Sequence, residues 1–209
     1  MPWRNLHLEI MKDFVQFINN KSSKFILKGG TSLMLYYNLD RFSEDLDFDS
    51  TDTKFFVYVN EFVRQYSKKY VGLTYRNAKD TDTVKRALIH YGNIKPLKVE
   101  VSYRSKIIDI ADYVNINGVN VYNIDTLMVF KTNAFIGRDK IRDLFDVCFI
   151  YLNYKLCLDR HTLLNFKNAL AYRGLNHFDY IIQTQTDELI DNNVLLQRFL
   201  TTWYDIGLT

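Results

Sequence analysis

The sequence contains little cysteine and little proline, with two of each among 209 residues. Cys148 and Cys157 lack metal-ligand spacing and stand in apolar stretches with helical periodicity, so we expect two reduced, buried thiols in a cytoplasmic protein. The scarcity of proline, together with the lack of Pro/Ser-rich tracts, makes a long flexible linker improbable. No run reaches the roughly 18 uncharged residues of a membrane span, so we expect no membrane association.

Several common catalytic and metal-binding patterns are also missing. The histidines have no zinc-ligand spacing, so surface or capping roles are expected for His7, His90, His161 and His177. The sequence has no Gly-x-x-x-x-Gly-Lys-Ser/Thr segment and no Ser/His/Asp constellation. Walker-type ATPases and serine hydrolases are therefore excluded as function classes.

Charge is present in moderate amount but is distributed unevenly. Residues 40–52 hold six acidic residues against one arginine, a balance of −5 that would attract cations. Residues 61–106 hold eleven lysines or arginines against four acidic residues, a balance of +7, interspersed with tyrosines. Such a segment could follow a phosphate backbone, although a solvated surface is the plainer explanation of any single charge.

Hydrophobic periodicity divides the chain near residue 123. We predict an α+β fold in which a mixed β-sheet flanked by helices (residues 1–122) is followed by a helical C-terminal half (residues 123–209). The expected strands are 24–28, 45–49, 71–76, 83–91, 96–103 and 107–110, with a hairpin through Asn115–Gly118. The expected helices are about 6–19, 31–37, 53–69, 124–136, 140–152, 161–172, 175–185 and 192–204.

Acidic and apolar residues alternate from Asp45 to Asp49. Because a strand repeats every two residues, Asp45, Asp47 and Asp49 share one face while Leu46 and Phe48 share the other. Nucleotidyl transfer needs divalent cations held by carboxylates, and the first two aspartates supply the most obvious pair. An Asp-x-Asp pattern alone is weak evidence, because such alternation is common on exposed strands.

A glycine turn stands upstream of these aspartates. Gly29 and Gly30 interrupt a predicted strand, and Thr31 or Ser32 can cap the helix that follows. Glycine lets backbone N–H groups approach a triphosphate, and a helix N-terminus favours negative charge. The turn and the Asp-x-Asp strand together predict a phosphate-binding and metal-binding unit.

These motifs resemble those of the AbiEii/AbiGii nucleotidyltransferase toxins of type IV toxin–antitoxin and abortive-infection systems, to which MenT proteins are related. Lys28–Leu33 and Arg41–Phe48 reproduce the family pattern Gly-Gly-Thr-x-Leu followed by Arg-x-Ser-x-Asp-Leu-Asp-Phe. Ile124–Lys131 and Arg138–Asp146 resemble two later motifs, so the similarity spans residues 24–152. The resemblance implies the fold of the DNA-polymerase-β-like nucleotidyltransferase superfamily.

The resemblance also implies that Lys131 and Asp143 contribute to the active site, completed by the helical half. Lys131 lies on an apolar helical stripe, where a lysine needs a partner unless it reaches solvent at the stripe's edge. Asp143 could pair with Lys131 or with a second basic group such as Arg142 or Arg138. Asp146 could instead be the functional acid.

The superfamily usually adds a third carboxylate from a neighbouring strand. Glu100 is the candidate, and it shares a strand face with Lys98 and Ser102. A cross-strand salt bridge with a lysine or arginine is the alternative role, and it is nearly as reasonable as metal binding.

The sequence therefore predicts a metal-dependent nucleotidyltransferase that transfers NMP from an NTP to RNA, with the tRNA 3′ end suggested by family relatives. The expected cofactor is Mg²⁺ or Mn²⁺, and a cognate antitoxin is an implied partner. The metal ligands would be Asp45, Asp47 and Glu100. The nucleotide would contact Gly29, Gly30, Thr31, Ser32, Arg41, Ser43 and Arg142.

Two other functions remain open. The same fold could transfer a nucleotidyl or phosphoryl group to a protein or a small molecule. Alternatively, the chain could be a catalytically weak NTP-binding protein that acts through a partner. Retention of both motif aspartates and a lysine on an apolar stripe argues against the second.

Overall fold

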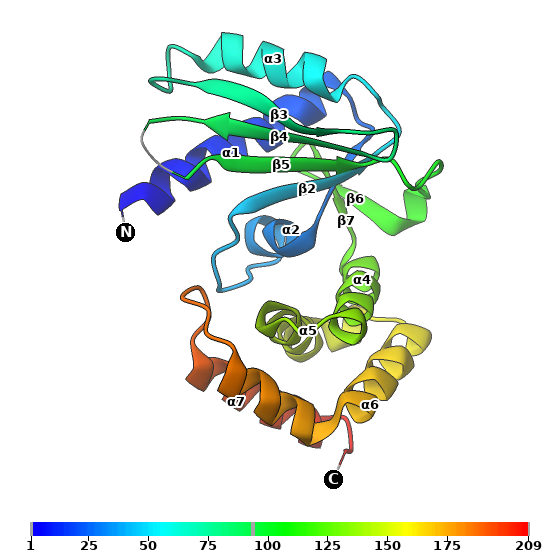
Figure 1. Cartoon of the computed structure of the whole chain (residues 1–209). Helices are drawn as coiled ribbons and strands as arrows, with labels where there is room; N and C mark the ends of the chain where they lie inside the picture. The colour runs from blue at the N-terminus through cyan, green and yellow to red at the C-terminus, as the bar shows by residue number, and fades with distance from the viewer. Residues whose placement is uncertain (1, 93–94, 209) are drawn as a thin grey trace. The chain divides into compact units, whose positions relative to one another are not determined.

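The computed structural model describes residues 2–92 and 95–208, which form two compact units. The first, which we call the sheet unit, comprises Met1–Tyr36 and Ser43–Tyr122. The second, the helical unit, comprises Tyr37–Phe42 and Asn123–Thr209 (Figure 1). The chain passes from strands to helices after Tyr122, and a short loop from its first half belongs to the helical unit.

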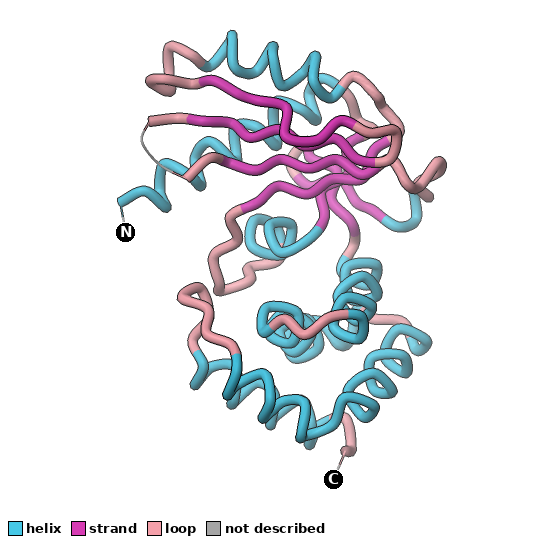
Figure 2. The backbone as a smooth tube through the Cα atoms, in the orientation of Figure 1, coloured by secondary structure: helices cyan, strands magenta, loops and turns pink. Residues whose placement is uncertain are grey.

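The sheet unit is built on one mixed sheet. Its strands among the described residues are β1 (Phe25–Lys28), β2 (Asp45–Ser50), β3 (Thr74–Asp80), β4 (Val84–His90), β5 (Leu97–Ser102), β6 (Tyr113–Ile116) and β7 (Val119–Tyr122). They lie in the order β3-β4-β5-β2-β1-β7-β6. Figure 2 shows the strands in magenta. β1 pairs antiparallel with β2 and parallel with β7, while β2 pairs parallel with β5. The predicted α+β class with a mixed sheet is confirmed.

Three helices pack onto this sheet. They are α1 (Pro2–Lys21), α2 (Gly29–Tyr36) and α3 (Phe55–Tyr66). The predicted apolar stripe of α1 is buried, since Ile10, Phe14 and Ile18 are inaccessible to solvent. The rings of Phe14 and of Phe62 in α3 pack edge to face with their centroids 5.0 Å apart, a favourable aromatic geometry.

The two-residue period of β2 separates core from chemistry. Leu46 and Phe48 are fully buried on one face, whereas Asp45 and Asp47 are half-buried on the other. A shift of pairing by one residue would bury the carboxylates and expose the apolar side chains, so burial fixes the register. The core therefore determines the face on which the carboxylates lie.

The helical unit contains α4 (Ile124–Gly137), α5 (Ile141–Tyr154), a 3-10 turn η2 (Lys155–Cys157), α6 (Arg160–Thr184) and α7 (Asn192–Asp205). α4 packs against α5 and α6, and α5 packs against α7. The side chains of Asn123, Asp159 and Asp191 accept hydrogen bonds from backbone N–H groups at the starts of α4, α6 and α7.

The two helices expected at 161–172 and 175–185 form the two arms of α6. Gly174 separates them, with a φ of 68° and a ψ of 179° that are not helical. Glycine tolerates this positive φ, so the residue that ends one predicted helix makes a kink rather than a loop.

One predicted strand is wrong. Residues 107–110 do not form a strand; a short 3-10 turn, η1 (Ile110–Asp112), follows instead. Asp109 accepts a hydrogen bond of 2.9 Å from the backbone N–H of Ala111, which favours a turn over extension. Ile107 and Ile110 are exposed, so no core contact opposes that turn.

The start of α2 also differs from the prediction. The helix begins at Gly29, so Thr31 and Ser32 lie inside it and neither is its cap. Gly29 follows the last residue of β1 directly and has a φ of +80°, which makes the strand-to-helix turn without additional loop residues. The Ser32 hydroxyl donates to the carbonyl oxygen of Gly29 at 2.8 Å.

Two further expectations about single residues fail. His7 was expected at the surface but is fully buried, since it lies on the α1 stripe one turn before Ile10. Cys148 is buried as expected, whereas Cys157 is exposed in η2, and both are free thiols. No helix among the described residues combines the length and the apolar character needed to cross a membrane.

Candidate active site

The predicted carboxylate pair lies where β2 meets its two neighbours. In the strand register Asp47 is opposite Lys28 of β1 and Glu100 of β5, and Asp45 is opposite Lys98 of β5. Directly opposed residues project from the same face of a sheet. Three carboxylates and two lysines from three strands therefore gather on one face.

Asp45 and Asp47 differ in their partners. The Asp45 carboxylate accepts from Lys98 Nζ at 2.6 Å. Asp47 has no hydrogen bond or ion pair with any described residue. Burial raises the pKa of Asp47, and the nearby charges of Asp45 and Glu100 raise it further, against the opposite effect of Lys98 and Lys28. A bound cation would relieve the cost of ionising this carboxylate.

Asp49 belongs to the scaffold of the same face. It is buried, accepts from Lys28 Nζ at 2.5 Å and accepts from the Tyr122 hydroxyl at 3.0 Å. These contacts tie β2 to β1 and β7 at the level of the carboxylate pair. The Asp49 carboxylate is therefore engaged by Lys28 and Tyr122 within the protein, although it lies on the predicted strand face.

Glu100 is held in a cross-strand ion pair. Arg86 of β4 donates to Glu100 Oε2 through Nε at 2.7 Å and also through Nη2. This is the salt bridge that the sequence left as the alternative to metal binding. The role of Glu100 as a metal ligand stays a prediction.

Gly29 brings the backbone against the unpaired carboxylate. A Cβ atom built on Gly29 would lie 3.3 Å from Asp47 Oδ2, which is a tight contact. Only glycine combines this approach with a φ of +80° at small cost. Gly30 follows in the first turn of α2. The glycine pair therefore places the N-terminus of this helix next to Asp47.

The hydroxyl groups of the motif are used inside the protein. Thr31 Oγ1 donates to the Asp45 carbonyl oxygen and lies 2.9 Å from Ser43 Oγ. Thr31, Ser32 and Ser43 are all buried. These contacts fasten α2 to the residues before β2, so their contribution to a nucleotide would come through backbone N–H groups. Their assignment as nucleotide contacts stays a prediction.

The carboxylate pair suits a hard cation of the Mg²⁺ type. Such ions take oxygen ligands, and Mg²⁺ is commonly held by one or two carboxylates together with substrate phosphates. Asp45 and Asp47 provide two carboxylates on one face, in agreement with that requirement. The described residues contain no cluster of three or more His, Cys, Asp or Glu side chains suited to a metal.

The helical unit contains a separate buried ion cluster. Arg41 donates from Nε and from Nη2 to the two oxygens of Asp146, each at 2.7 Å. Lys131 Nζ also lies 2.6 Å from Asp146 Oδ2. Burial alone would raise the pKa of Asp146, but Lys131 and Arg41 outweigh it and lower that pKa below its usual range.

Asp143 lies beside this cluster with a different principal partner. Arg138 donates to Asp143 from Nε at 2.7 Å and from Nη2 at 3.0 Å. Lys131 Nζ is 3.9 Å from Asp143, farther than from Asp146. Of the two proposed basic partners, Arg138 is the one found, because Arg142 pairs with Asp187.

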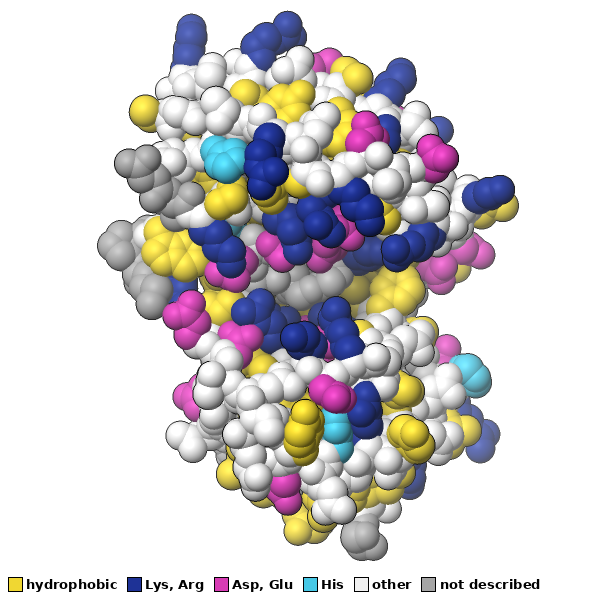
Figure 3. Space-filling view, viewed as in Figure 1, with side chains coloured by type: hydrophobic (Ala, Val, Ile, Leu, Met, Phe, Trp, Pro, Cys, Tyr) yellow, Lys and Arg dark blue, Asp and Glu magenta, His cyan; other side chains and the backbone are white. Residues whose placement is uncertain are grey.

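The helical unit thus groups Arg41, Lys131 and Asp143, and the sheet unit groups the glycines with Asp45, Asp47 and Glu100. Lys98 and Lys28 were missed by the sequence reasoning, although Lys98 lies two residues from Glu100 and therefore on its strand face. Figure 3 shows Lys, Arg and acidic side chains intermixed on the viewed face of each unit. The participation of Lys131 and Asp143 in one active site with the β2 pair stays a prediction.

Comparisons with known proteins identify relatives of the whole chain. Residues 16–200 match the family model for nucleotidyl transferase AbiEii toxin of the type IV toxin–antitoxin system. JHP933 from Helicobacter pylori is 25% identical, with a TM-score of 0.81 over 99% of this chain and 92% of its own. A second H. pylori protein, described as a candidate nucleotidyltransferase, is 25% identical, with a TM-score of 0.80 over 99% and 95%.

A more distant structure shares the fold. MenT4, a nucleotidyltransferase toxin from Mycobacterium tuberculosis, is 17% identical, with a TM-score of 0.53 over 93% of this chain and 82% of its own. No curated protein matches the chain. The fold and the family model agree with each other and with the resemblance of the motifs.

Proposed function

The chain belongs to the AbiEii family of nucleotidyl transferase toxins of type IV toxin–antitoxin systems, and on that premise we propose that its acceptor is the 3′ end of an RNA, with tRNA as the class. The donor is an NTP, and Mg²⁺ or Mn²⁺ is the cofactor. A cognate antitoxin follows from the type of system to which the family belongs.

The observation that carries the catalytic part is the position of Asp47. It is half-buried and unpaired among the described residues, and the Gly29 backbone lies against it. A structural aspartate at such a place would be expected to have a partner, as Asp49 does. A carboxylate that lacks one, beside the N-terminus of a helix, suits a substrate-linked cation and a phosphate.

The proposed reaction joins an RNA hydroxyl to the α-phosphorus of the NTP. The hydroxyl oxygen forms the new P–O bond, the bond to the β-phosphate breaks, and pyrophosphate leaves with the electron pair. The hydroxyl proton passes to a carboxylate or to water. Asp45 and Asp47 would hold the cation, which when bound neutralises phosphate charge and activates the attacking oxygen.

Support for a nucleic-acid acceptor comes from the sheet face. By register, Arg76 of β3 is opposite Leu88 of β4, which is opposite Lys98 of β5, and Lys79 of β3 is opposite Arg86. A β-bulge between Asn77 and Lys79 puts both β3 cations on one face, although they are three positions apart, an odd spacing that would otherwise put them on opposite faces. The cations therefore extend from the carboxylate pair towards the sheet edge.

The helical unit enters the proposal through family resemblance. Lys131 would offset phosphate charge, Asp143 would act with it, and Arg41 and Arg142 would assist nucleotide binding. Each of these four side chains forms an ion pair with another charged side chain of the helical unit.

A labelling experiment tests the function. Purified protein is incubated with each of the four α-³²P-labelled NTPs, with Mg²⁺ or Mn²⁺, and with total RNA or total protein. We expect label in RNA, concentrated in the tRNA fraction and removed by 3′-terminal digestion. The variants Asp45→Asn and Asp47→Asn should lose transfer by orders of magnitude, while Asp40→Asn, which changes an exposed aspartate, should retain it.

The alternatives predict different results. Label in the protein fraction or in a small molecule would replace the RNA acceptor but keep the transferase. Equal activity of wild type and both β2 variants would refute the metal assignment. Binding of NTP without transfer to any fraction would indicate the catalytically weak binding protein.

A further inference from the structure

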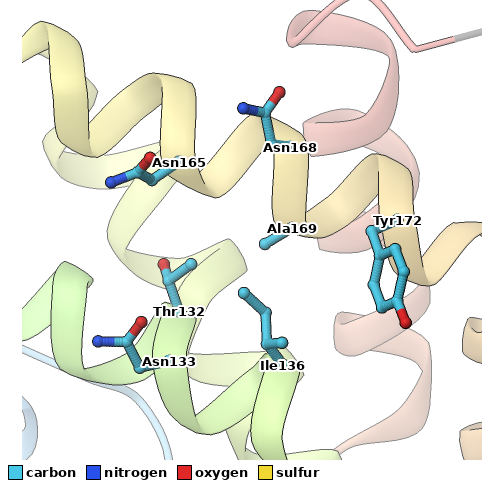
Figure 4. Close-up of a pocket in the computed structure, with 7 residues that line it drawn as sticks. All are labelled: Thr132, Asn133, Ile136, Asn165, Asn168, Ala169 and Tyr172. Atoms are coloured by element: carbon cyan, nitrogen blue, oxygen red, sulfur yellow. The ribbon is translucent and has the colours of Figure 1, made fainter.

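The helical unit contains a groove between α4 and α6 with a volume of about 520 Å³ (Figure 4). This lies within the roughly 300–1,000 Å³ usual for small-ligand sites. Its lining comes entirely from those two helices, and none of the seven lining residues is charged. A phosphate or a metal would find no countercharge here, so an uncharged ligand is favoured.

The polar groups of the groove are mostly amides. Asn133 comes from α4, whereas Asn165 and Asn168 come from α6, and all three are exposed. Asparagine is a poor helix former, so three of them around one groove are unfavourable for the helices themselves. Each amide offers both a donor and an acceptor, the combination that reads the edge of a nucleobase.

Thr132 supplies a second, independent observation. The residue is only 4% exposed, and its hydroxyl is buried with no hydrogen-bond partner in the described structure. Buried hydroxyls are normally paired, and this one belongs to the lining of the groove. Figure 4 shows Thr132 and Ile136 extending from α4 towards α6. A ligand in the groove would give the hydroxyl a partner.

The other end of the groove is aromatic. Tyr172 of α6 is 81% exposed and lines the groove at the end away from Asn133 and Asn165 (Figure 4). Ile136 and Ala169 provide apolar surface between these ends. An exposed tyrosine ring beside amide groups is the arrangement on which unpaired bases stack while their edges are hydrogen-bonded.

We propose that the groove between α4 and α6 is a nucleobase-binding site that takes an unpaired base of the RNA acceptor. The assignment of the base to the acceptor rests on the proposed function, whereas the capacity to bind a base does not. A free nucleoside would present the same chemistry, so the experiment must separate the two sources.

The first arm uses adenosine, which has no phosphate that a cation at the β2 carboxylate pair could bind. Its affinity for the full chain is measured by equilibrium dialysis. Tyr172→Ala should weaken binding about tenfold or more, because a stacking surface is lost. Tyr204→Ala, which removes an exposed tyrosine of α7 that does not line the groove, should leave affinity unchanged.

Thr132→Val separates ligand binding from folding. The substitution keeps the shape but removes a hydroxyl that no described residue satisfies, so the melting temperature should stay constant or rise. Adenosine binding should nevertheless weaken. If Thr132→Val and Tyr172→Ala both bind adenosine as the wild type does, the groove is not a base site.

The second arm uses an RNA with a single-stranded 3′ end and the same RNA with abasic positions there. If the wild type binds the abasic RNA more weakly than the intact RNA, and Tyr172→Ala binds the two RNAs equally, the base belongs to the RNA. Adenosine binding that depends on Tyr172 without any such RNA effect assigns a free nucleoside and overturns the acceptor assignment. Failure of the labelling experiment would remove the transferase function but would not alter the adenosine result.

Discussion

Arg41 and Asp146 form a bidentate ion pair in which both hydrogen bonds are 2.7 Å long and the residues are 105 positions apart. The guanidinium fork matches the carboxylate, and both side chains are almost completely buried. Lys131 shares the same carboxylate. Asp146 is therefore the centre of the ion cluster, and it connects the 37–42 loop to α4 and α5.

Replacing Asp146 should destabilise the helical unit strongly. Asp146→Asn would leave Arg41 buried without its carboxylate partner and would leave Lys131 only the more distant Asp143, and breaking such a buried pair costs about 3–5 kcal/mol. Asp40→Asn breaks the exposed pair with Arg198 and should cost no more than about 1 kcal/mol. Urea unfolding of both variants measures the difference. Equal losses would contradict the central role of Asp146.

Lys131→Ala and Asp143→Ala should lower transfer by orders of magnitude while the protein stays folded. After loss of Lys131, Asp146 keeps Arg41; after loss of Asp143, Arg138 remains largely exposed to water. Neither variant therefore leaves an isolated buried charge. Turnover and melting temperature are measured together. Activity that falls only with the fraction unfolded would assign both residues to the scaffold.

Gly29→Ala should reduce both stability and activity. Alanine at a φ of +80° costs about 1–2 kcal/mol, and its Cβ would be 3.3 Å from Asp47 Oδ2. Gly137→Ala is the matched control, because a Cβ there meets no atom within 4 Å. That variant should be neutral or more stable. Thermal melts and the labelling assay distinguish the two, and equal behaviour would refute the role of Gly29.

Burial of His7 should make stability depend on pH. His7 contacts the Tyr91 hydroxyl and the Glu44 carbonyl oxygen. Burial lowers its pKa, against the opposite effect of Glu44 and Asp45 and with help from Lys95. The unfolded chain then binds the proton more readily, so stability is complete above a pH of about 6.5 and falls below it.

The measurement for His7 is a pair of melting curves. Between pH 7.5 and pH 5.5 the wild type should lose more stability than His7→Gln. For a protein of this size, each kcal/mol of lost stability lowers the melting temperature by about 2–4 °C. The glutamine variant cannot titrate and provides the reference. Parallel pH profiles would show that His7 is not responsible.

The basic sheet face should determine how RNA binding depends on salt. The double variant Arg76→Ala/Lys79→Ala should reduce the magnitude of the slope of log K against log salt by about 1.4. Each phosphate contact to single-stranded RNA contributes roughly 0.7 to that slope, and the variant removes two. Lys12→Ala with Lys24→Ala removes equal charge outside β3–β5 and should leave the slope unchanged. Filter binding at several salt concentrations gives both slopes. Identical slopes would exclude this face.

The sequence by itself determined the local features of this protein. A two-residue period put Asp45 and Asp47 on one strand face, and the glycine pair marked the junction of β1 with α2. Helical stripes predicted α1, α4, α5 and α7. His7 lies one turn before Ile10 on the stripe of α1, so the same helical period places this buried histidine on the core face.

Only the tertiary structure decided which charges meet. The sequence paired Asp143 with any of three cations, whereas folding gave Arg138 to Asp143 and brought Lys131 and Arg41 to Asp146. The groove between α4 and α6 could not be predicted from the sequence either, because the whole of α5 lies between these two helices along the chain. Spacing fixes the face on which a side chain lies, but strand order and helix packing bring distant faces together, and no local period encodes them.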